Sequence, residues 1–405
     1  MNIRTRLVHP PRIPGEPARA VSTPIYQTAT FEQQLDEGGG RWDYSRSGNP
    51  TRDILESQLA ALDGATRAFA FNSGMAAVSA TLRLLQSGDE LVVGEDLYGG
   101  TNRILLDLAP RTGVVVRFVD TRNLDEIARA ITWHTKLVFI ETPTNPRLRV
   151  ADIAAIAELA HARGATLAVD NSMLSPLLQK PLELGADIAL QSGTKLLGGH
   201  SDLTAGVLAV RDERLAERLA FVQNCDGTAL APFDSWLLLR GLETLEVRLS
   251  RQQASAQRLA DWLARRPDLK AVHYPGLPGH AGAHTHYRQA AGPGVVLSIE
   301  VGSTTRARQL AERARLFNTV VSFGSVSSSI CIPGAMSHAS IAPSERAKRG
   351  ISDDLVRISV GVEDVADLIA DLDQALREDG AAASTTRPAR SLVGKVGSKG
   401  KAEVA

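Results

Sequence analysis

The sequence LQSGTKLLGGHSD occupies residues 190–202 and places a lysine in a turn of small residues that follows an apolar run. Lys195 has the hydroxyl residues Ser192 and Thr194 before it and a Gly-Gly pair at 198–199 after it. A lysine packs poorly in so tight a turn. It is well placed if its amine must be desolvated and held close to a phosphate, with the two glycines letting the backbone approach that phosphate. The rest of the chain should then supply the other parts of a binding site.

Short apolar runs alternate with amphipathic helical patterns along the chain from residue 51 to about 233. The runs are ELVVG, VVVRFV, KLVFIE, TLAVD, DIALQS and GVLAV. Between two of them, residues 151–164 carry a helical stripe with Asp152 as a candidate N-cap and Gly164 as a stop. Strands separated by such helices predict βαβ units and a largely parallel sheet. The large domain is therefore expected over residues 51–233.

The remaining segments have different patterns. Residues 1–50 are rich in Pro, Gly and Arg and predict an irregular arm. Residues 234–379 mix helical and strand patterns and predict a smaller α+β domain. Its expected elements are a helix over about 234–266, strands at 294–301, 319–324 and 355–361, and helices at 303–317 and 363–378. Residues 380–405 contain few apolar residues and predict a disordered, mildly basic tail.

Composition excludes several classes of partner. The 405 residues contain 45 basic and 45 acidic side chains, so nothing favours nucleic acid or a membrane surface. No apolar run approaches the roughly 18 residues of a membrane helix, and the first residues lack the pattern of a secretory signal. Cys225 and Cys331 are too few for a disulfide framework and are interpreted as reduced thiols. We expect a soluble, cytoplasmic protein.

Four further stretches end predicted strands, where ligands collect in a parallel sheet. The first is a strand-to-helix turn whose free N–H groups and helix dipole suit an anion. The others carry an aromatic ring, an amide and a buried acid that needs a cationic partner. The residues are Ser73 and Gly74 in FNSGMAAVSATL, Tyr98 in LYGGT, Asn145 in ETPTNP and Asp170 in LAVDNS.

With the lysine, these features meet the requirements of pyridoxal 5′-phosphate. Lys195 would form the Schiff base, Asp170 would keep the pyridine nitrogen protonated, and Tyr98 would stack on the ring. Each feature alone has an ordinary structural explanation: Asp170 as a helix cap or ion pair, Tyr98 as a packing residue, and Lys195 as a solvated turn lysine. Their combination in this order favours the cofactor.

The motifs SGMAA, YGGT, ETPTNP, VDNS and SGTKLLGGHSD resemble those of the cystathionine lyase and synthase family, the Cys/Met-metabolism group of fold type I pyridoxal-phosphate enzymes. The likeness covers residues 5–376. Within the family it is strongest to the plant-type β-lyases, through YSRSGNPTRDILESQLAALD, ALAPFDSWLLLRG and VVSFGSVSSSICIPGAMSHASI. The resemblance implies a large domain with a mostly parallel seven-stranded sheet, a smaller α+β C-terminal domain and a homotetramer.

The resemblance also implies a role for each matching residue. Lys195 would carry the cofactor and act as the base, and Asp170 and Tyr98 would contact its ring. The phosphate would be held by Gly74, Met75, Ser192 and Thr194, and by Tyr44 and Arg46 of a neighbouring subunit. Asn145 would lie near the ring oxygen, while Arg357 and Ser322 would bind the substrate's α-carboxylate. The sequence departs from the family at Gly193, where Ala is usual, and at Leu196, where Tyr or Phe is usual.

The implied activity is the β-elimination of L-cystathionine to homocysteine, pyruvate and ammonia. The γ-acting relatives often carry a glutamate where this chain has Ser327, which favours β-chemistry. A γ-lyase, a γ-synthase or an O-acetylhomoserine sulfhydrylase-type enzyme is the first alternative, and a non-catalytic relative that binds the cofactor is the second. His280, His284 and His286 have a spacing that invites a metal, but no metal site is expected because they fall in a loop remote from the lysine motif.

Overall fold

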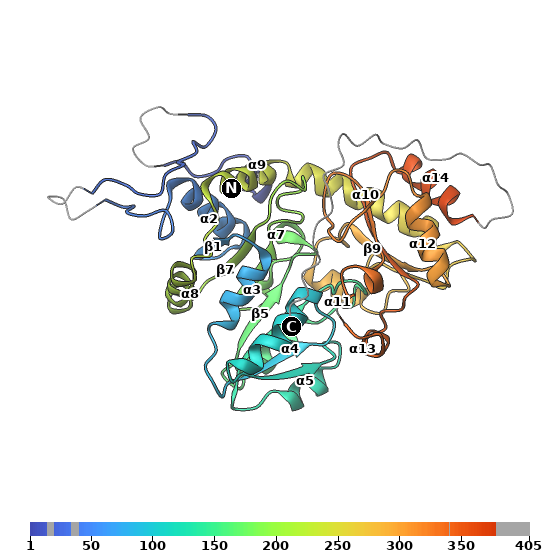
Figure 1. Ribbon diagram of the computed structural model, residues 1–405, viewed down its shortest axis with the longest axis horizontal. Coiled ribbons are helices and arrows are strands. Elements are labelled where there is room, and N and C mark those ends of the chain that lie inside the picture. Colours follow the sequence, from blue (N-terminus) through green and yellow to red (C-terminus); the bar gives the residue numbers. More distant parts are fainter. Residues whose placement is uncertain (14–19, 34–39, 340, 378–405) are drawn as a thin grey trace, which may run out of the picture.

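The computed structural model describes residues 1–13, 20–33, 40–339 and 341–377. Figure 1 shows a large domain around one sheet and a C-terminal domain around another. The predicted tail at 380–405 lies outside the described residues. Within the described ranges, no helix has the length and apolar character needed to span a bilayer.

The sheet of the large domain has seven strands in the order β1-β7-β6-β5-β4-β2-β3. All neighbouring pairs are parallel except those of β7, which is antiparallel to both β1 and β6. The predicted mostly parallel α/β sheet is confirmed. Its strands are β1 (Arg67–Phe71), β2 (Glu90–Gly94), β3 (Val115–Val119), β4 (Thr135–Glu141), β5 (Thr166–Asp170), β6 (Ile188–Ser192) and β7 (Gly206–Val210).

Helices cover both faces of this sheet, which explains why the middle residues of the central strands are apolar on both faces. Several helices begin at side-chain caps. The Ser73 hydroxyl accepts from the N–H of Ala76, and Asp152 accepts from the N–H of Ala155, as predicted. The helices are α2 (Pro50–Asp63), α3 (Gly74–Leu82), α4 (Gly99–Arg111), α5 (Leu124–Ala130), α6 (Ile153–His161), α7 (Ser175–Leu178) and α8 (Glu213–Asp226), with a 3-10 turn at Pro181–Leu184.

The stretch predicted to be helical near 234–266 is helical, but it forms two helices, α9 (Pro232–Glu243) and α10 (Leu245–Ala264), rather than one continuous helix. Thr244, with φ −104° and ψ 2°, interrupts the helical geometry. The Arg248 guanidinium donates to the Gly241 carbonyl at 2.8 Å, which a continuous helix would use internally. α9 packs on α2, and α10 leads into the C-terminal domain (Figure 1).

The C-terminal sheet has the order β10-β11-β12-β9-β8 and is antiparallel except for the β10–β11 pair. Its strands are β8 (Ala271–His273), β9 (Val296–Glu300), β10 (Asn318–Thr319), β11 (Ser329–Cys331) and β12 (Leu355–Ser359). The accompanying helices are α11 (Ala283–Gln289), α12 (Thr304–Arg313), α13 (Pro343–Lys348) and α14 (Val365–Leu376), with a 3-10 turn at Pro333–Ala335.

The strand predicted at 319–324 is mostly wrong. Residues 321–324 leave the sheet and turn toward the large domain, because Gly324 adopts φ +83° and its N–H donates to the Ser359 hydroxyl at 2.9 Å. This departure brings Ser322 and Phe323 beside Lys195. The irregular segment therefore belongs to the site and not to the sheet.

Within the described residues 1–13, 20–33 and 40–49 there is little regular structure apart from α1 (Ile3–Leu7), which packs on α2 and α10. Residues 20–33 and 40–49, drawn in blue in Figure 1, extend away from the large sheet. They carry Tyr44 and Arg46, so the arm holds both predicted contacts to a neighbouring subunit.

Candidate active site

The carboxyl ends of β4, β5 and β6 open into a cavity that segments of the C-terminal domain close from the other side. The cavity encloses about 850 Å³ of space, part of it open to solvent. The structure thereby brings together most of the residues predicted for the site. Those that line the cavity are Gly74, Met75, Tyr98, Asn145, Asp170, Ser192, Thr194, Lys195 and Arg357.

Lys195 follows β6 and points its amine into this cavity. Its Nζ donates to the Ser322 hydroxyl at 2.8 Å and lies 5.1 Å from the centre of the Phe323 ring. Burial, together with the nearby Arg357 guanidinium, lowers the pKa of the amine to about 8. A lysine held in this way is partly neutral near physiological pH, as a nucleophile or base requires.

The Gly-Gly pair after the lysine does not line the cavity, and its predicted approach to a phosphate is wrong. A Cβ on Gly199, which has φ +72°, would collide with the Arg248 guanidinium. A Cβ on Gly198 would lie 2.9 Å from the Gly193 carbonyl. Arg248 also donates to the Leu196 carbonyl at 2.8 Å. These glycines make room for close packing beneath the lysine turn.

The two departures from the family pattern have packing consequences. A Cβ on Gly193 would lie 2.8 Å from the Ala205 Cβ and 3.2 Å from a Leu238 methyl carbon, so the chain leaves no space there. Leu196 is fully buried in the core of the large domain. Neither position lines the cavity.

The start of α3 forms a cradle of the kind that holds a phosphate. Gly74 is its first residue, and a Cβ there would lie 3.2 Å from both Cβ and Oγ of Ser192. The first N–H groups of a helix have no intrahelical acceptor and lie at its positive end. Ser192 and Thr194 line the same space, and the Thr194 hydroxyl also accepts from the Ala205 N–H at 3.0 Å. This donor set suits a phosphate group.

Two carboxylates lie side by side at the floor of the cavity. Asp170 pairs with Glu141 in the register of β5 and β4 and accepts from the Ser172 N–H at 2.9 Å. Burial raises the pKa of Asp170. A buried carboxylate of this kind is stabilised when a cation binds beside it, as a protonated pyridine nitrogen would.

Glu141 is the principal residue that the sequence interpretation missed. Its two oxygens accept from the backbone N–H groups of Tyr98 and Asn145, both at 2.9 Å. Burial, and next the Asp170 charge, raise the pKa of Glu141 well above its ordinary value. It ties two site segments to the end of β4. The signal was available, because KLVFIE is an apolar strand that ends on a glutamate.

Arg357 reaches the cavity from β12 and is only 1% exposed. Its Nη1 donates to the Asn145 side chain at 2.9 Å, and Nη2 donates to the Ser322 carbonyl at 2.8 Å. Among the described residues its Nε has no hydrogen-bond partner. Burial lowers the pKa of the guanidinium. A buried cation with an unused donor suits an incoming carboxylate.

Tyr98, Tyr44 and Arg46 differ in their placement. Tyr98 lies at the start of α4, lines the cavity and is 41% exposed. Arg46 donates to the carbonyl and side chain of Asn224 at 2.7 and 2.9 Å, and its guanidinium lies 5.4 Å from the Tyr44 ring. Neither Tyr44 nor Arg46 lines the cavity of its own chain. Their contribution to a neighbouring subunit stays a prediction.

Ser327 also lies away from the cavity lining. Its hydroxyl accepts from the Asn318 side chain at 3.4 Å. Within the described chain, Ser327 therefore makes no direct contact in the cavity that could select between β- and γ-chemistry.

The loop predicted for the three histidines is partly wrong, because His284 and His286 lie in α11, and the contacts of His280 and His286 are of a structural kind. His286 is buried and its Nε2 lies 2.9 Å from the Gly292 carbonyl, while His280 Nδ1 accepts from the Gly282 N–H at 3.2 Å. In the described ranges no group of three or more His, Cys, Asp or Glu side chains is arranged to hold a metal ion.

The comparisons with known proteins agree with this geometry. Residues 4–377 match the family described as Cys/Met metabolism PLP-dependent enzymes. The chloroplastic cystathionine β-lyase of Mimosa pudica is 56% identical over 361 residues, which are 89% of this chain and 79% of the relative. The corresponding Arabidopsis thaliana protein is 54% identical over 362 residues, 89% of this chain and 78% of the relative.

A solved structure extends the likeness to three dimensions. Cystathionine γ-lyase from Lactobacillus plantarum, complexed with L-serine, superimposes with a TM-score of 0.90 at 39% identity, over 93% of this chain and 98% of that one. This chain therefore has the fold of fold type I enzymes, and the cavity described above lies within that fold. On this evidence the chain belongs to the Cys/Met metabolism family of PLP-dependent enzymes.

Proposed function

We propose that this protein is a carbon–sulfur lyase that cleaves L-cystathionine, with one water, to homocysteine, pyruvate and ammonia. The observation that carries the proposal is that Lys195 and Arg357 line one cavity and both donate to Ser322, Lys195 to its hydroxyl and Arg357 to its carbonyl. The Lys195 amine, with a pKa of about 8, is suited to remove the Cα proton of an amino acid. The Arg357 guanidinium, with an unused donor, is suited to bind its α-carboxylate. The 54–56% identity to proteins named cystathionine β-lyase supports the choice of reaction.

The residues present fit pyridoxal 5′-phosphate. We place its phosphate at the start of α3, against Gly74, Met75, Ser192 and Thr194. Its ring nitrogen would lie beside Asp170, and its aldehyde carbon beside Lys195, with Tyr98 along the ring. When bound, the cofactor supplies an electron sink for the charge that develops at the substrate Cα.

The side chains of this chain then have distinct tasks. Arg357 holds the α-carboxylate by a bidentate pair, with its orientation fixed by Asn145 and by the Ser322 carbonyl. Lys195 removes the Cα proton, because its neutral amine is held at the cavity and a lowered pKa makes it available. The Cβ–S bond breaks and the sulfur leaves with its electron pair. The protonated Lys195 can return the proton to the departing sulfur.

The β-over-γ choice gives the first prediction. Incubation with L-cystathionine should yield pyruvate as the main keto acid, because elimination at Cβ requires removal of the Cα proton alone, whereas γ-cleavage needs a second deprotonation at Cβ. Chromatography of the derivatised keto acids distinguishes pyruvate from 2-oxobutyrate. Mainly 2-oxobutyrate would replace the proposal by a γ-lyase. Absence of both keto acids from a cofactor-loaded protein would favour a non-catalytic relative.

We also propose that the active unit is at least a dimer within a homotetramer, with Tyr44 and Arg46 completing the phosphate site of a neighbour. The support is their position on an arm that extends from the large sheet and the 43% exposure of Tyr44 (Figure 1).

The second prediction follows from this assembly. Arg46→Ala should raise the cofactor concentration for half-maximal activity about tenfold, as expected for loss of a charge-assisted phosphate contact. Arg41→Ala is the matched control, because Arg41 is an arginine on the same arm that pairs with Asp53 and has no proposed contact with the neighbour's phosphate. Cofactor titration measures the effect. A fully active monomer in sedimentation at the assay concentration would contradict the assembly.

A cytoplasmic location is part of the same proposal. Cys225 is exposed and Cys331 is buried, and neither forms a disulfide in the described chain. Two free thiols suit a reducing compartment. The neutral net charge leaves the small sulfur amino acid as the expected partner, without nucleic acid.

A further inference from the structure

The contact between Arg357 and Asn145 crosses the boundary between the two domains. Arg357 belongs to β12 of the C-terminal domain, whereas Asn145 lies in the loop after β4 of the large domain. The orientation of the Arg357 guanidinium therefore depends on the position of this loop relative to β12 and the strands beside it. A shift of the loop would misplace Arg357 without touching Lys195.

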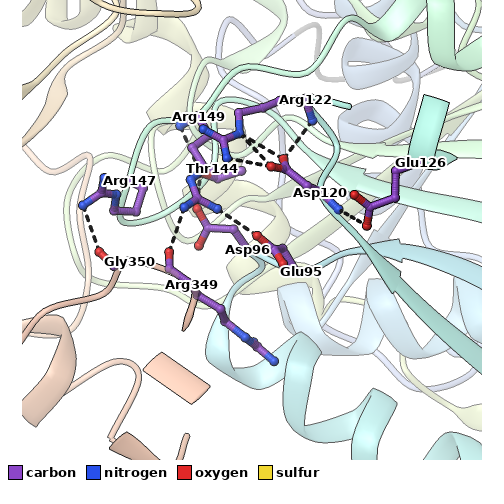
Figure 2. A network of polar contacts seen from close by, with 10 residues as sticks. All are labelled: Glu95, Asp96, Asp120, Arg122, Glu126, Thr144, Arg147, Arg149, Arg349 and Gly350. Carbon is purple, nitrogen blue, oxygen red and sulfur yellow. Dashed lines mark hydrogen bonds and ion pairs between the residues drawn. The ribbon is translucent and has the colours of Figure 1, made fainter. Parts of the chain in front are cut away.

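The loop is fastened to the C-terminal domain by contacts that flank β12. The Ser298 hydroxyl donates to the Pro146 carbonyl at 2.7 Å, and Ser298 is directly opposite Arg357 in the sheet register. Arg147 donates to the Glu300 carboxylate at 2.7 Å. It also donates to the Gly350 carbonyl at 2.8 Å, as Figure 2 shows. The Arg147 side chain is 21% exposed, so these charge-assisted bonds are largely shielded from water.

Arg149 makes a second connection from the same loop. One of its nitrogens donates to Glu95 of the large domain at 3.0 Å, and another donates to the Arg349 carbonyl at 3.0 Å (Figure 2). The loop is closed on itself as well, because the Thr144 hydroxyl accepts from the Arg149 N–H and donates to Asp96 at 2.6 Å. A displacement of Arg149 is thus transmitted to Thr144, the residue before Asn145.

We propose that Arg147 and Arg149 are positioning residues that clamp the Asn145 loop to the C-terminal domain and so hold Arg357 in the orientation that binds an amino acid's α-carboxylate. The clamp would act on affinity for the amino acid, not on the proton transfer at Lys195. This inference rests on the carboxylate-binding role proposed for Arg357.

The test separates amino-acid binding from chemistry and from cofactor binding. In the holoenzyme, Arg147→Ala and Arg149→Ala should each raise KM for L-cystathionine about tenfold with kcat within about twofold of wild type, the pattern of lost uniform binding. Glycine, which has the same α-carboxylate, should bind about tenfold more weakly by calorimetry. Cofactor affinity should fall less than glycine affinity, because the clamp does not include the phosphate cradle, although Asn145 itself would lie near the cofactor ring.

Arg122→Ala is the matched control. Arg122 is in the same network, but within the part of the chain that the structure describes its side chain bonds to Asp120 of the large domain alone (Figure 2), so glycine affinity and KM should stay at wild-type values. If an alanine variant does not fold, Arg147→Lys keeps the charge but not the planar head group whose Nη1 donates to both Glu300 and Gly350, and should give a smaller loss of glycine affinity.

Unchanged glycine affinity in folded variants would overturn the clamp, and so would an equal loss in Arg122→Ala or a parallel loss of cofactor affinity. A wild-type protein that binds glycine but forms no pyruvate would refute the proposed reaction alone. The calorimetric comparison would still decide on the clamp.

Discussion

Lys195→Ala is expected to abolish pyruvate formation while leaving a folded protein. The variant lacks the only amine that lines the cavity in the described chain, and with it both the attachment point of the cofactor and the base at Cα. A positioned acid–base group alone contributes about 100- to 10,000-fold, so kcat should fall at least about 1,000-fold. The visible absorbance of the lysine-bound cofactor should also disappear. Lys136→Ala, an exposed lysine on β4, should retain wild-type turnover and absorbance.

The stability of the apoprotein distinguishes this loss from misfolding. Burial lowers the pKa of Lys195 in the folded protein to about 8, from the ordinary 10.5 of a lysine. A group with a lowered folded pKa destabilises the fold while it is charged, so this penalty is fully present below pH 8 and disappears as pH rises toward 10.5. Lys195→Ala removes the buried charge, although it also removes the bond to Ser322. The thermal unfolding of Lys195→Ala at pH 7 should therefore be close to that of wild type. If the variant keeps its activity, the assignment of Lys195 to the active site is refuted.

Much of the site could be predicted from the sequence because of the sheet. Parallel strands bring their carboxyl ends to one edge, so Asp170 and Lys195 were expected to converge once their strands were identified. Gly74 and the hydroxyl residues before the lysine belong to the same edge. Local patterns sufficed there, because a strand or a helix start decides where each side chain lies.

Other parts depend on contacts between distant segments. Glu141 ends an apolar strand, which is visible in the sequence, but it also accepts from the Tyr98 N–H 43 residues away, and no local pattern expresses that contact. β8 and β11 have three residues each, too few for a visible alternation. The break between α9 and α10 depends on Arg248 reaching back to Gly241, and the role of Gly199 depends on the same arginine. In each case tertiary packing overrides the local signal.

Asp170→Asn should give the second large loss of activity, about 100-fold or more in kcat, a size typical for removal of one preorganised electrostatic group. Asparagine has nearly the same shape and can still accept from the Ser172 N–H, so the floor of the cavity should persist. It carries no charge to stabilise a protonated pyridine nitrogen, and the cofactor then withdraws electrons from Cα less effectively. Pyruvate formation measures the loss, with Asp187→Asn as the control at the opposite end of β6.

The same variant separates an electrostatic role for Asp170 from a structural one. Burial raises the pKa of Asp170 in the apoprotein, so its ionised form is destabilising there and is relieved only when a cation binds beside it. Asp170→Asn should therefore leave the apoprotein at least as stable as wild type at pH 7, while the bound cofactor loses affinity and its absorbance changes. A variant with a kcat within a few-fold of wild type would remove Asp170 from the mechanism. A strongly destabilised apoprotein would instead show that Asp170 has a structural role. A buried carboxylate with a raised pKa is not expected to stabilise the apoprotein when it is charged, so that result would contradict the electrostatic role.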